Sequence, residues 1–511
     1  MLVITLILGG VLILLAGFNY RFKTPSISSK SVGLIVLGDI GRSPRMLYHA
    51  QSFLKNDYTT YIVAYRGSNP PLSLIENDKC HFIYLSQPLA SSSSWSSKLP
   101  KLGFLLIAPF KVLLTSLYLL SALLFKIPQS PTLFFVQNPP SIPTLPIVQL
   151  VVWLRNSRLV IDWHNTGYSV LSLRLGSEHP VVKIAKKIEF WFGKKAYAHL
   201  MVTETMKNQL VKEAQLQGKA IAFHDRPPKH FRRQTNLESH QLFQRLPVLK
   251  SINFPPSSCS ETESLSSSES TTIFTSSDGK PLPNRPALLV TSTSHTPDED
   301  LSILLEALTI YEQTALSSSS SSKLPRIVML VTGKGSGKKS FESSISKLVA
   351  SKKLGQSVQI HTTWLELEDY PKILGSSDLG ISLHSSTSGF DLPMKVVDMF
   401  GCELPVLALD FECIGELVKD GVNGKTFKNA KDLAEQLIDL LSGFPSNNNS
   451  SNSKLEELRK GIKLARYGQL ETAPTTSRNN GEEWENWEQH WDRLLLPLLS
   501  LDSHSQVSVT R

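Results

Sequence analysis

The chain has 511 residues, enough for two or three domains, and its 41% hydrophobic and 19% charged residues are the balance of a globular protein. Lys and Arg outnumber Asp and Glu by 53 to 44, a net charge of +9 without a dominant basic block, which favours anionic membranes or phosphorylated substrates over nucleic acid. The four cysteines are dispersed and form no CxxC pair, so they indicate neither a disulfide framework nor a zinc site.

The first segment, Leu2–Phe18, carries no charge and is slightly short of the roughly 20 residues that span a bilayer. Basic residues follow it at Arg21, Lys23 and Lys30, and the positive-inside rule then leaves the body of the protein in the cytoplasm. A cleaved signal peptide is the alternative, but its basic residues should precede the apolar core. We therefore expect an uncleaved transmembrane anchor at 1–20.

An α/β domain is predicted over residues 31–233. The apolar run Val32–Leu37 ends at a glycine turn, and a helical pattern continues to about Leu54. The turn lacks the GxGxxG spacing of a dinucleotide site, but it offers two glycines and two cations to an anionic ligand: Gly38, Gly41, Arg42 and Arg45.

More strands of this domain are predicted from apolar runs that alternate with helical patterns: Tyr58–Ala64, Leu133–Val136, Leu159–Trp163, Leu200–Thr203 and Ala220–Phe223. Such alternation is typical of a parallel sheet with helices on both faces. Polar residues follow several strands, as in QNPP at 137–140, DWHN at 162–165 and HDRP at 224–227. Several such strand ends together suggest a site, because parallel strands end at one edge of the sheet.

Residues 102–127 are unusually apolar, although Pro109 and Lys111 interrupt the run and lysines flank it. The segment is long enough to cross a membrane, but it lies between two strands of one predicted sheet. A single crossing would place the glycine turn and residues 379–406 on opposite sides of the bilayer. We therefore predict a helix in the membrane interface, and a buried domain helix is the alternative.

Residues 234–284 are predicted to be a flexible, Ser-rich linker. A second α/β domain follows at 285–445, with strands predicted at Ala287–Thr293, Arg326–Thr332, Val358–His361, Leu379–Leu383 and Pro405–Leu409. A polar insertion and a C-terminal helix complete the chain at 446–511. The stripe formed by Trp484, Trp487, Trp491 and Leu495 on that helix is expected to serve packing.

Residues 379–406 read LGISLHSSTSGFDLPMKVVDMFGCELPV, which predicts a strand, a loop, a helix and a strand. The helix would point its positive N-terminal end at the loop 388–391, where amides of Ser388, Gly389 and Phe390, beside Asp391, face an anion. Two helix residues three apart, Lys395 and Asp398, are suited to a diphosphate and to ribose hydroxyls. An ordinary crossover with a solvated Lys–Asp contact is the alternative.

Two further stretches of the second domain carry charge at strand ends. TGKGSGKK at 332–339 follows a strand without matching a P-loop, so Lys334 and nearby amides are a candidate phosphate site and a flexible basic turn is the alternative. TPDED at 296–300 starts a helix, and its carboxylates are expected to cap that helix rather than to catalyse.

Seven motifs in this order resemble the chitobiosyldiphosphodolichol β-mannosyltransferase family: VLGDIGRSPRM, QNPPSIPTL, IDWHNTGYS, HDRPP, TSTSHTPDED, VTGKG and SGFDLPMKVVDMFGC. The resemblance implies a GT-B fold, in which two doubly wound, Rossmann-like α/β domains face a cleft. It also implies transfer of the first mannose from GDP-mannose, in β1,4 linkage, to N,N′-diacetylchitobiosyl-diphosphodolichol on the cytoplasmic face of the endoplasmic reticulum. Assembly with itself and with the later cytoplasmic-face mannosyltransferases is implied as well.

A β-linked product from an α-linked donor requires inversion, so we expect one in-line displacement assisted by a general base. The charge of leaving GDP is assigned to Lys334, Lys395 and the loop amides, with no cofactor and no metal. The base is expected in the N-terminal domain at Asp39 or His164, with Glu204 and Asp225 as further candidates. Asn165 and the glycine turn are expected to contact the acceptor.

Three positions depart from the family's pattern: His295 replaces Trp, Thr166 replaces Tyr and Glu403 replaces Gly. At Glu403 a residue that adopts a positive φ is expected, and its carboxylate is expected near the phosphate loop. Two other functions stay open. One is a retaining GT-B enzyme that uses Asp391 and Asp398 as an acid pair, and the other is a catalytically silent, membrane-anchored partner protein.

Overall fold

The computed structural model describes residues 30–86, 101–254, 271–296, 299–317, 324–386, 389–445, 453–464 and 486–500, except for the side chains of 101–108 and 500. The chain divides into two compact units, Met1–His224 and Asp225–Arg511. This division lies slightly ahead of the predicted domain boundary at residue 233. The predicted anchor at 1–20 lies outside the described residues.

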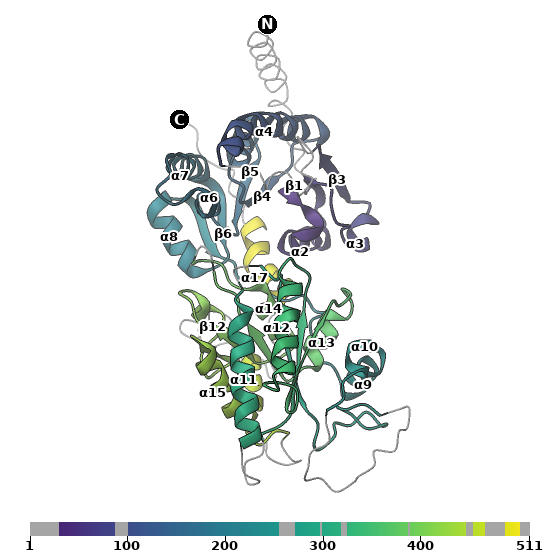
Figure 1. Cartoon of the computed structure of the whole chain (residues 1–511). Helices are drawn as coiled ribbons and strands as arrows, with labels where there is room; N and C mark the ends of the chain where they lie inside the picture. Colours follow the sequence, from purple (N-terminus) through teal and green to yellow (C-terminus); the bar gives the residue numbers. More distant parts are fainter. Residues whose placement is uncertain are drawn as a thin grey trace. The chain divides into compact units, whose positions relative to one another are not determined.

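Seven parallel strands form the sheet of the first unit, in the order β3-β2-β1-β4-β5-β6-β7 (Figure 1). Four residues of β1, Val32, Leu34, Ile35 and Val36, are fully buried, as expected for a central parallel strand covered on both faces. The strands are β1 (Ser31–Asp39), β2 (Thr59–Tyr65), β3 (Cys80–Leu85), β4 (Leu133–Asn138), β5 (Arg158–Trp163), β6 (Lys195–Met201) and β7 (Gln217–Ala222). All but β3 were predicted from the sequence.

Helices follow most of these strands and cover the sheet. Because crossovers between parallel strands are right-handed, α2 covers one face, whereas α5 and α7, which contact each other, cover the opposite face. The helical elements are η1 (Ile40–Arg42), α2 (Pro44–Lys55), α3 (Leu72–Ile75), α4 (Lys101–Ser121), the π-helical turn η2 (Ala122–Lys126), α5 (Thr144–Arg155), α6 (Gly167–Leu175), α7 (Pro180–Gly193) and α8 (Glu204–Ala214).

The helix α4 presents apolar side chains both to the core and to solvent. Leu119 is fully buried, whereas Phe110, Leu113 and Leu117 are exposed by 55%, 42% and 41%. Among the described helices, the stretch Pro109–Lys126 is long and apolar enough to cross a membrane, and only 28% of it is buried. The exposed side fits the predicted interfacial helix, whose membrane contact stays a prediction.

Six parallel strands form the sheet of the second unit, in the order β10-β9-β8-β11-β12-β13. They are β8 (Ala287–Ser292), β9 (Ile327–Thr332), β10 (Val358–Thr363), β11 (Leu379–Ser382), β12 (Val406–Leu409) and β13 (Gly424–Phe427), of which only β13 was not predicted. Their helical elements are α11 (Leu301–Ser317), α12 (Lys338–Ala350), α13 (Tyr370–Ser376), α14 (Met394–Gly401), η3 (Ile414–Glu416), α15 (Ala430–Leu441), α16 (Lys454–Leu464) and α17 (Trp487–Ser500).

Two apolar layers enclose this second sheet. Side chains alternate along β8, so that Leu289 packs with Leu304 and Leu433 of α11 and α15, while Leu288 packs with Phe400 of α14. Both layers are nearly inaccessible to solvent. The strand ends, where the predicted site residues lie, are therefore held on a rigid base.

Residues 234–284 differ from the predicted flexible linker. The chain forms α9 (Asn236–Arg245) and α10 (Pro247–Lys250) there. A capping box starts α9, in which the Thr235 hydroxyl accepts from the Glu238 amide and the Glu238 carboxylate accepts from the Thr235 amide. The composition-based prediction missed these helices because it weighed the Ser-rich residues 255–270, which lie outside the described part of the chain.

The C-terminal helix α17 confirms the predicted packing stripe as far as it is described. Trp487, Trp491 and Leu495 are at most 2% exposed, and Trp487 donates its backbone N–H to the carbonyl of Pro227 at 3.0 Å. Trp484 lies outside the described residues. These aromatic side chains therefore serve packing within the fold.

Candidate active site

The second unit brings three loops together at the carboxyl edge of its sheet. Strands β9, β8 and β11 are neighbours, so the loops that follow them lie side by side. Two glycines in the loop after β9 allow it to approach the loop after β8 closely. A Cβ on Gly333 would lie 1.8 Å from the Thr293 carbonyl oxygen, and one on Gly335 would lie 1.9 Å from that of Ser294. Only residues without a side chain fit there.

Glu299 joins the loop after β8 to α14. Its carboxylate accepts from the Thr293 hydroxyl at 2.7 Å and from the Ser294 amide at 2.9 Å, and it forms an ion pair with Lys395. The Glu299 side chain is 3% exposed, whereas that of Lys395 is 30% exposed. The predicted diphosphate cation is therefore held by a buried carboxylate while part of its own surface remains open to a ligand.

The charge of Glu299 depends on these partners. Burial alone raises the pKa of Glu299, but the Lys395 ammonium, the Thr293 hydroxyl and the Ser294 amide outweigh it and leave the pKa below its usual range. The expected capping role is thus wrong for Glu299. It holds for Asp300, whose carboxylate accepts from the Ser302 amide at 3.0 Å at the start of α11.

The loop after β11 is organised around Asp391. The carboxylate of Asp391 lies 3.2 Å from His384 Nε2 and accepts from the Ser386 hydroxyl. The Gly389 amide, which was expected to face an anion, donates to the Ser386 hydroxyl oxygen at 2.8 Å, and Gly389 has a φ of +80°. Ser388 lies outside the described residues, and Phe390 is half-buried.

Lys334 lies in the loop after β9, as predicted. Its ammonium lies 3.9 Å from the centre of the Trp364 ring, a cation–π contact that holds the side chain without neutralising it. Trp364 is itself 50% exposed. This arrangement keeps a positive charge at the same sheet edge as Lys395.

Asp398 lies one turn after Lys395 on α14 and has an acidic neighbour. Desolvation raises the pKa of Asp398 well above its usual range, and the nearby Asp225 carboxylate raises it further, although a hydrogen bond from Tyr370 opposes both. Tyr370 also accepts from the Ser292 hydroxyl at 3.2 Å. Asp398 is half-buried as a residue, and a carboxyl group with a raised pKa can both donate hydrogen bonds to sugar hydroxyls and accept them.

In the first unit, Asp39 fixes the glycine turn after β1. One carboxylate oxygen accepts from the Gly41 amide at 3.0 Å, and both accept from the Ser68 amide, at 3.0 and 2.9 Å. A Cβ on Gly67 would lie 2.4 Å from the Asp39 carboxyl group, so this loop needs glycine. The Arg42 side chain is 81% exposed, with its Nε 3.6 Å from Asp39.

Arg45 differs from its predicted role as a phosphate donor. Its side chain is 5% exposed, and its guanidinium binds the fully buried Asp162 through two hydrogen bonds of 2.9 and 2.8 Å. Burial alone raises the pKa of Asp162, but Arg45, His164 and His49 together hold it well below its usual range. Arg45 therefore stabilises a buried carboxylate rather than the surface of the turn.

His164 is the part of this network that solvent reaches. Its Nε2 lies 2.8 Å from Asp162 Oδ2, and its side chain is 24% exposed, whereas Asp162 is fully buried. The backbone amide of His164 donates to the Asn138 carbonyl at 2.8 Å, which fixes the strand end. A partly exposed imidazole oriented by a buried carboxylate has the arrangement of a general base.

Asn165 starts the helix α6 together with a buried acid. The Asn165 side-chain oxygen accepts from the Thr166 amide at 2.7 Å, and the Glu189 carboxylate accepts from the amides of Gly167 and Tyr168 at 2.8 and 3.0 Å. Burial is the main reason that the pKa of Glu189 is raised. Glu189 thus occupies the helix terminus, and Asn165 has a local structural role beside any contact with an acceptor.

Comparison with known proteins assigns the family. Residues 285–443 match the profile of the family described as "Glycosyl transferases group 1". A Dictyostelium discoideum protein named "Chitobiosyldiphosphodolichol beta-mannosyltransferase" is 38% identical over 485 residues, which cover 90% of this chain and 92% of the relative. The Homo sapiens protein of that name is 38% identical over 92% of this chain and 93% of its own. The chain belongs to the chitobiosyldiphosphodolichol β-mannosyltransferase family. The resemblance found in its motifs is thereby confirmed.

Not every relative of this mannosyltransferase family member carries the same name. An Arabidopsis thaliana protein named "UDP-glycosyltransferase TURAN" is 40% identical over 81% of this chain and 89% of its own. Among solved structures, Anabaena Alr3699/HepE in complex with UDP covers 85% of this chain and 94% of its own with a TM-score of 0.52 and 13% identity. WaaG, a glycosyltransferase of lipopolysaccharide biosynthesis, gives 0.51 at 12% identity. These likenesses confirm the GT-B fold, with two Rossmann-like units.

The structure shows the surroundings of the three residues at which this mannosyltransferase family member departs from the family's pattern. Glu403 has a φ of +54°, as its position requires, but its carboxylate lies 3.1 Å from Lys463 of α16, at the far end of α14 from the loop. Its expected place near that loop is therefore wrong. Thr166 is buried at the start of α6. His295 has a φ of +51° and packs on Phe341 with ring centres 5.9 Å apart.

Proposed function

We propose that this chain transfers mannose from GDP-mannose to N,N′-diacetylchitobiosyl-diphosphodolichol and forms a β1,4 linkage. The observation that carries the proposal is the 38% identity, over about nine-tenths of both chains, to relatives whose name states this acceptor and this sugar. Identity of this extent over nearly the whole chain supports a shared fold and a shared reaction. The reaction itself depends on the residues that this fold brings together at its sites.

The donor is proposed to bind at the carboxyl edge of the second sheet. Lys395 and Lys334 supply the charge that the diphosphate of the leaving GDP requires, because both keep their ammonium groups at this edge without full neutralisation. Asp398 is assigned to the ribose hydroxyls. In this mechanism the cations of the protein meet the developing charge, and no metal ion takes part.

The general base is proposed to be His164. If Nε2 donates its proton to the ionised Asp162, then Nδ1 carries the lone pair that removes the proton of the acceptor hydroxyl. The imidazolium formed in this way is stabilised by the Asp162 carboxylate. Asp39, the other candidate, already uses both oxygens for backbone amides of its own turn, and for this reason we favour His164.

We propose that the enzyme acts at the cytoplasmic face of the endoplasmic reticulum membrane. The apolar residues 2–18, followed by basic residues, support an anchor with this orientation. A dolichol-linked acceptor stays in the bilayer, so an anchored enzyme meets it at the headgroup level. The donor sugar nucleotide is then taken from the cytosol.

The test is to incubate the purified chain with a chitobiosyl-diphosphate lipid and radiolabelled GDP-mannose, in parallel with UDP-glucose, UDP-N-acetylglucosamine and GDP-glucose. We expect a product from GDP-mannose alone, sensitive to β-mannosidase and resistant to α-mannosidase. The UDP-sugars are included because of the name of the Arabidopsis relative. Transfer from a UDP-sugar but not from GDP-mannose would refute the donor assignment, and an α-linked product would refute inversion.

A further inference from the structure

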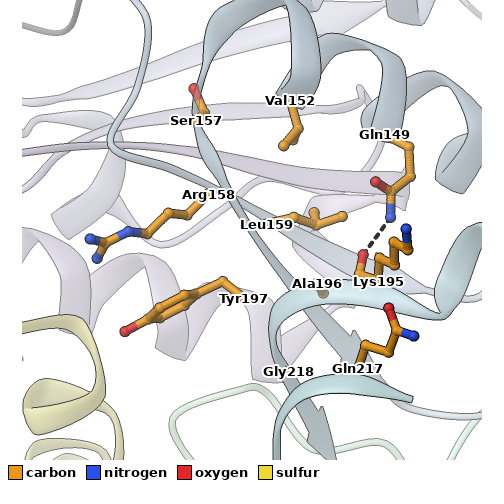
Figure 2. A pocket seen from close by; sticks show the side chains of 10 residues that line it. All are labelled: Gln149, Val152, Ser157, Arg158, Leu159, Lys195, Ala196, Tyr197, Gln217 and Gly218. Atoms are coloured by element: carbon orange, nitrogen blue, oxygen red, sulfur yellow. Dashed lines mark hydrogen bonds between the residues drawn. The ribbon is translucent and has the colours of Figure 1, made fainter. Parts of the chain in front are cut away.

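A pocket of about 480 Å³ lies at the opposite edge of the first sheet from the predicted site, where its strands begin. It is formed by the end of α5 and the starts of β5, β6 and β7. Figure 2 shows Val152, Leu159 and Ala196 in the middle of its wall, with Arg158 and Tyr197 on one side and Lys195 on the other. The pocket therefore has an apolar floor with Lys195 beside it, while the Arg158 side chain points to the other side of the strand ends.

The charged residues among those that line this pocket are basic. None of the described residues that line it is acidic. The Arg158 guanidinium lies 4.8 Å from the centre of the Tyr197 ring, and the ammonium of Lys219, one residue beyond the lining Gly218, lies 5.4 Å from the same ring. The hydroxyl oxygen of Ser157 is buried without a hydrogen-bond partner among the described residues. Such a surface attracts a phosphate group.

Two exposed tryptophans flank the pocket. Trp153 follows the lining residue Val152 on α5 and is 55% exposed, and Trp191 is 78% exposed near the end of α7. The Gln149 amide ties these two helix ends together, because it donates to the carbonyls of Phe192 and Lys195 at 2.8 and 2.6 Å. Exposed Trp side chains beside cations are typical of surfaces at the membrane interface.

The start of the described chain lies at the same edge. Lys30 precedes β1, and β1, β4 and β5 are neighbouring parallel strands, so Lys30 and Arg158 lie about 10 Å apart along the edge, at about 4.8 Å per strand. Residues 19–29 join Lys30 to the apolar segment Leu2–Phe18 and span at most about 40 Å. A segment of this composition in a bilayer keeps this edge within reach of the membrane surface.

We propose that this pocket binds the phosphate of an anionic phospholipid headgroup through Lys195, with Arg158 adding positive charge at the same sheet edge and with Trp153 and Trp191 in the interface. The apolar floor of the pocket contacts the glycerol and the first methylene groups. This site is distinct from the sheet edge to which the sugar transfer is assigned, and it does not depend on that assignment. It would fix the orientation of the first unit on the membrane.

The test uses the full chain in lipid nanodiscs made of phosphatidylcholine with brominated acyl chains, with or without about one-fifth phosphatidylserine. Tryptophan fluorescence is measured, and the contribution of Trp153 and Trp191 is obtained by subtracting a Trp153→Phe/Trp191→Phe variant. We expect phosphatidylserine to increase the quenching of this contribution at least twofold. The increase should disappear in Arg158→Glu/Lys195→Glu. It should persist in Lys347→Glu/Lys431→Glu, which carries the same charge change on exposed lysines of the second unit.

Three outcomes would overturn the proposal: quenching that does not respond to phosphatidylserine, an equal response in Arg158→Glu/Lys195→Glu, or an equal loss of response in the control pair. Inorganic phosphate at the ionic strength of a matched NaCl sample distinguishes the two sources of the anion. Phosphate that abolishes the response, where NaCl does not, would assign the pocket to a free anion. Thermal unfolding checks that the charge-reversal variant is folded, and Arg158→Gln/Lys195→Gln replaces it if it is not.

Discussion

Replacing Lys395 by alanine separates its two contributions, to the stability of the second unit and to the reaction. The substitution leaves the Glu299 carboxylate, 3% exposed, with the hydroxyls of Thr293 and Ser294 and the Ser294 amide as neutral donors but without a cation. Removing one partner of a buried ion pair costs about 3–5 kcal/mol, and since Lys395 is 30% exposed we expect the smaller cost of about 2–3 kcal/mol. Loss of a preorganised cation at the leaving group should lower kcat by about 10²–10³-fold.

The double variant Lys395→Ala/Glu299→Gln tells these contributions apart. The neutral amide no longer requires a cation, so about 1–2 kcal/mol of the free energy of unfolding should return. Activity should not return, because the charge on the diphosphate side is still missing. Lys425→Ala is the matched control, since Lys425 lies 3.4 Å from Asp439 in a partly exposed ion pair of the same unit and should contribute less than about 1 kcal/mol.

The free energy of unfolding is measured by urea denaturation and the activity by initial rates with radiolabelled GDP-mannose over a range of donor concentrations. If kcat recovers together with stability in the double variant, Lys395 acts only as the partner of Glu299. The assignment of Lys395 to the diphosphate is then wrong. Wild-type kinetics in a folded Lys395→Ala variant would lead to the same conclusion.

Four further predictions follow from other parts of the fold. His164→Ala should lower kcat by about 10²–10⁴-fold with unchanged GDP-mannose affinity by calorimetry, and full activity would leave Asp39 as the base. Leu113→Ser/Leu117→Ser should slow transfer to a long-chain lipid acceptor more than to a short soluble analogue, whereas equal losses with a lowered Tm would indicate a core helix. A tag after Arg511 should be digested by protease added to sealed microsomes, and protection would reverse the topology. Burial lowers the pKa of His199 to about 4, so the unfolded chain binds the proton first and His199 makes stability fall with pH below 6.5, by about 2 kcal/mol at pH 5. In urea denaturation, His199→Phe should remove this contribution and leave that of the buried His49, whose pKa is also lowered to about 4.

Most strands were predictable because central parallel strands are buried on both faces and read as continuous apolar runs. The two missed strands, β3 and β13, lie at the edges of their sheets. β13 has only four residues, GKTF, and in β3 only three of the six residues are buried. An edge strand has one neighbour and part of its surface in water, so it needs fewer apolar residues and leaves a weaker pattern.

The partners of the charged residues were not predictable from spacing. Lys395 pairs with a carboxylate 96 positions earlier in the chain, and Arg45 binds one that is 117 positions later. Asp162 lies at the end of β5, and Glu299 lies in the stretch predicted to start a helix after β8; these positions were the available signal. It indicated the correct sheet edge but not which side chains turn inward, because that depends on the packing of loops from separate strands.

Asp162 and the residues bound to it hold the His164 imidazole in one orientation. Both oxygens of Asp162 are engaged by Arg45, and Oδ2 also lies 2.8 Å from His164 Nε2. The bidentate contact with Arg45 fixes the plane of the carboxylate and therefore the direction of the imidazole. In the proposed mechanism, Arg45 and Asp162 would therefore be positioning residues for His164, and the imidazole nitrogen that does not face Asp162 would meet the acceptor hydroxyl.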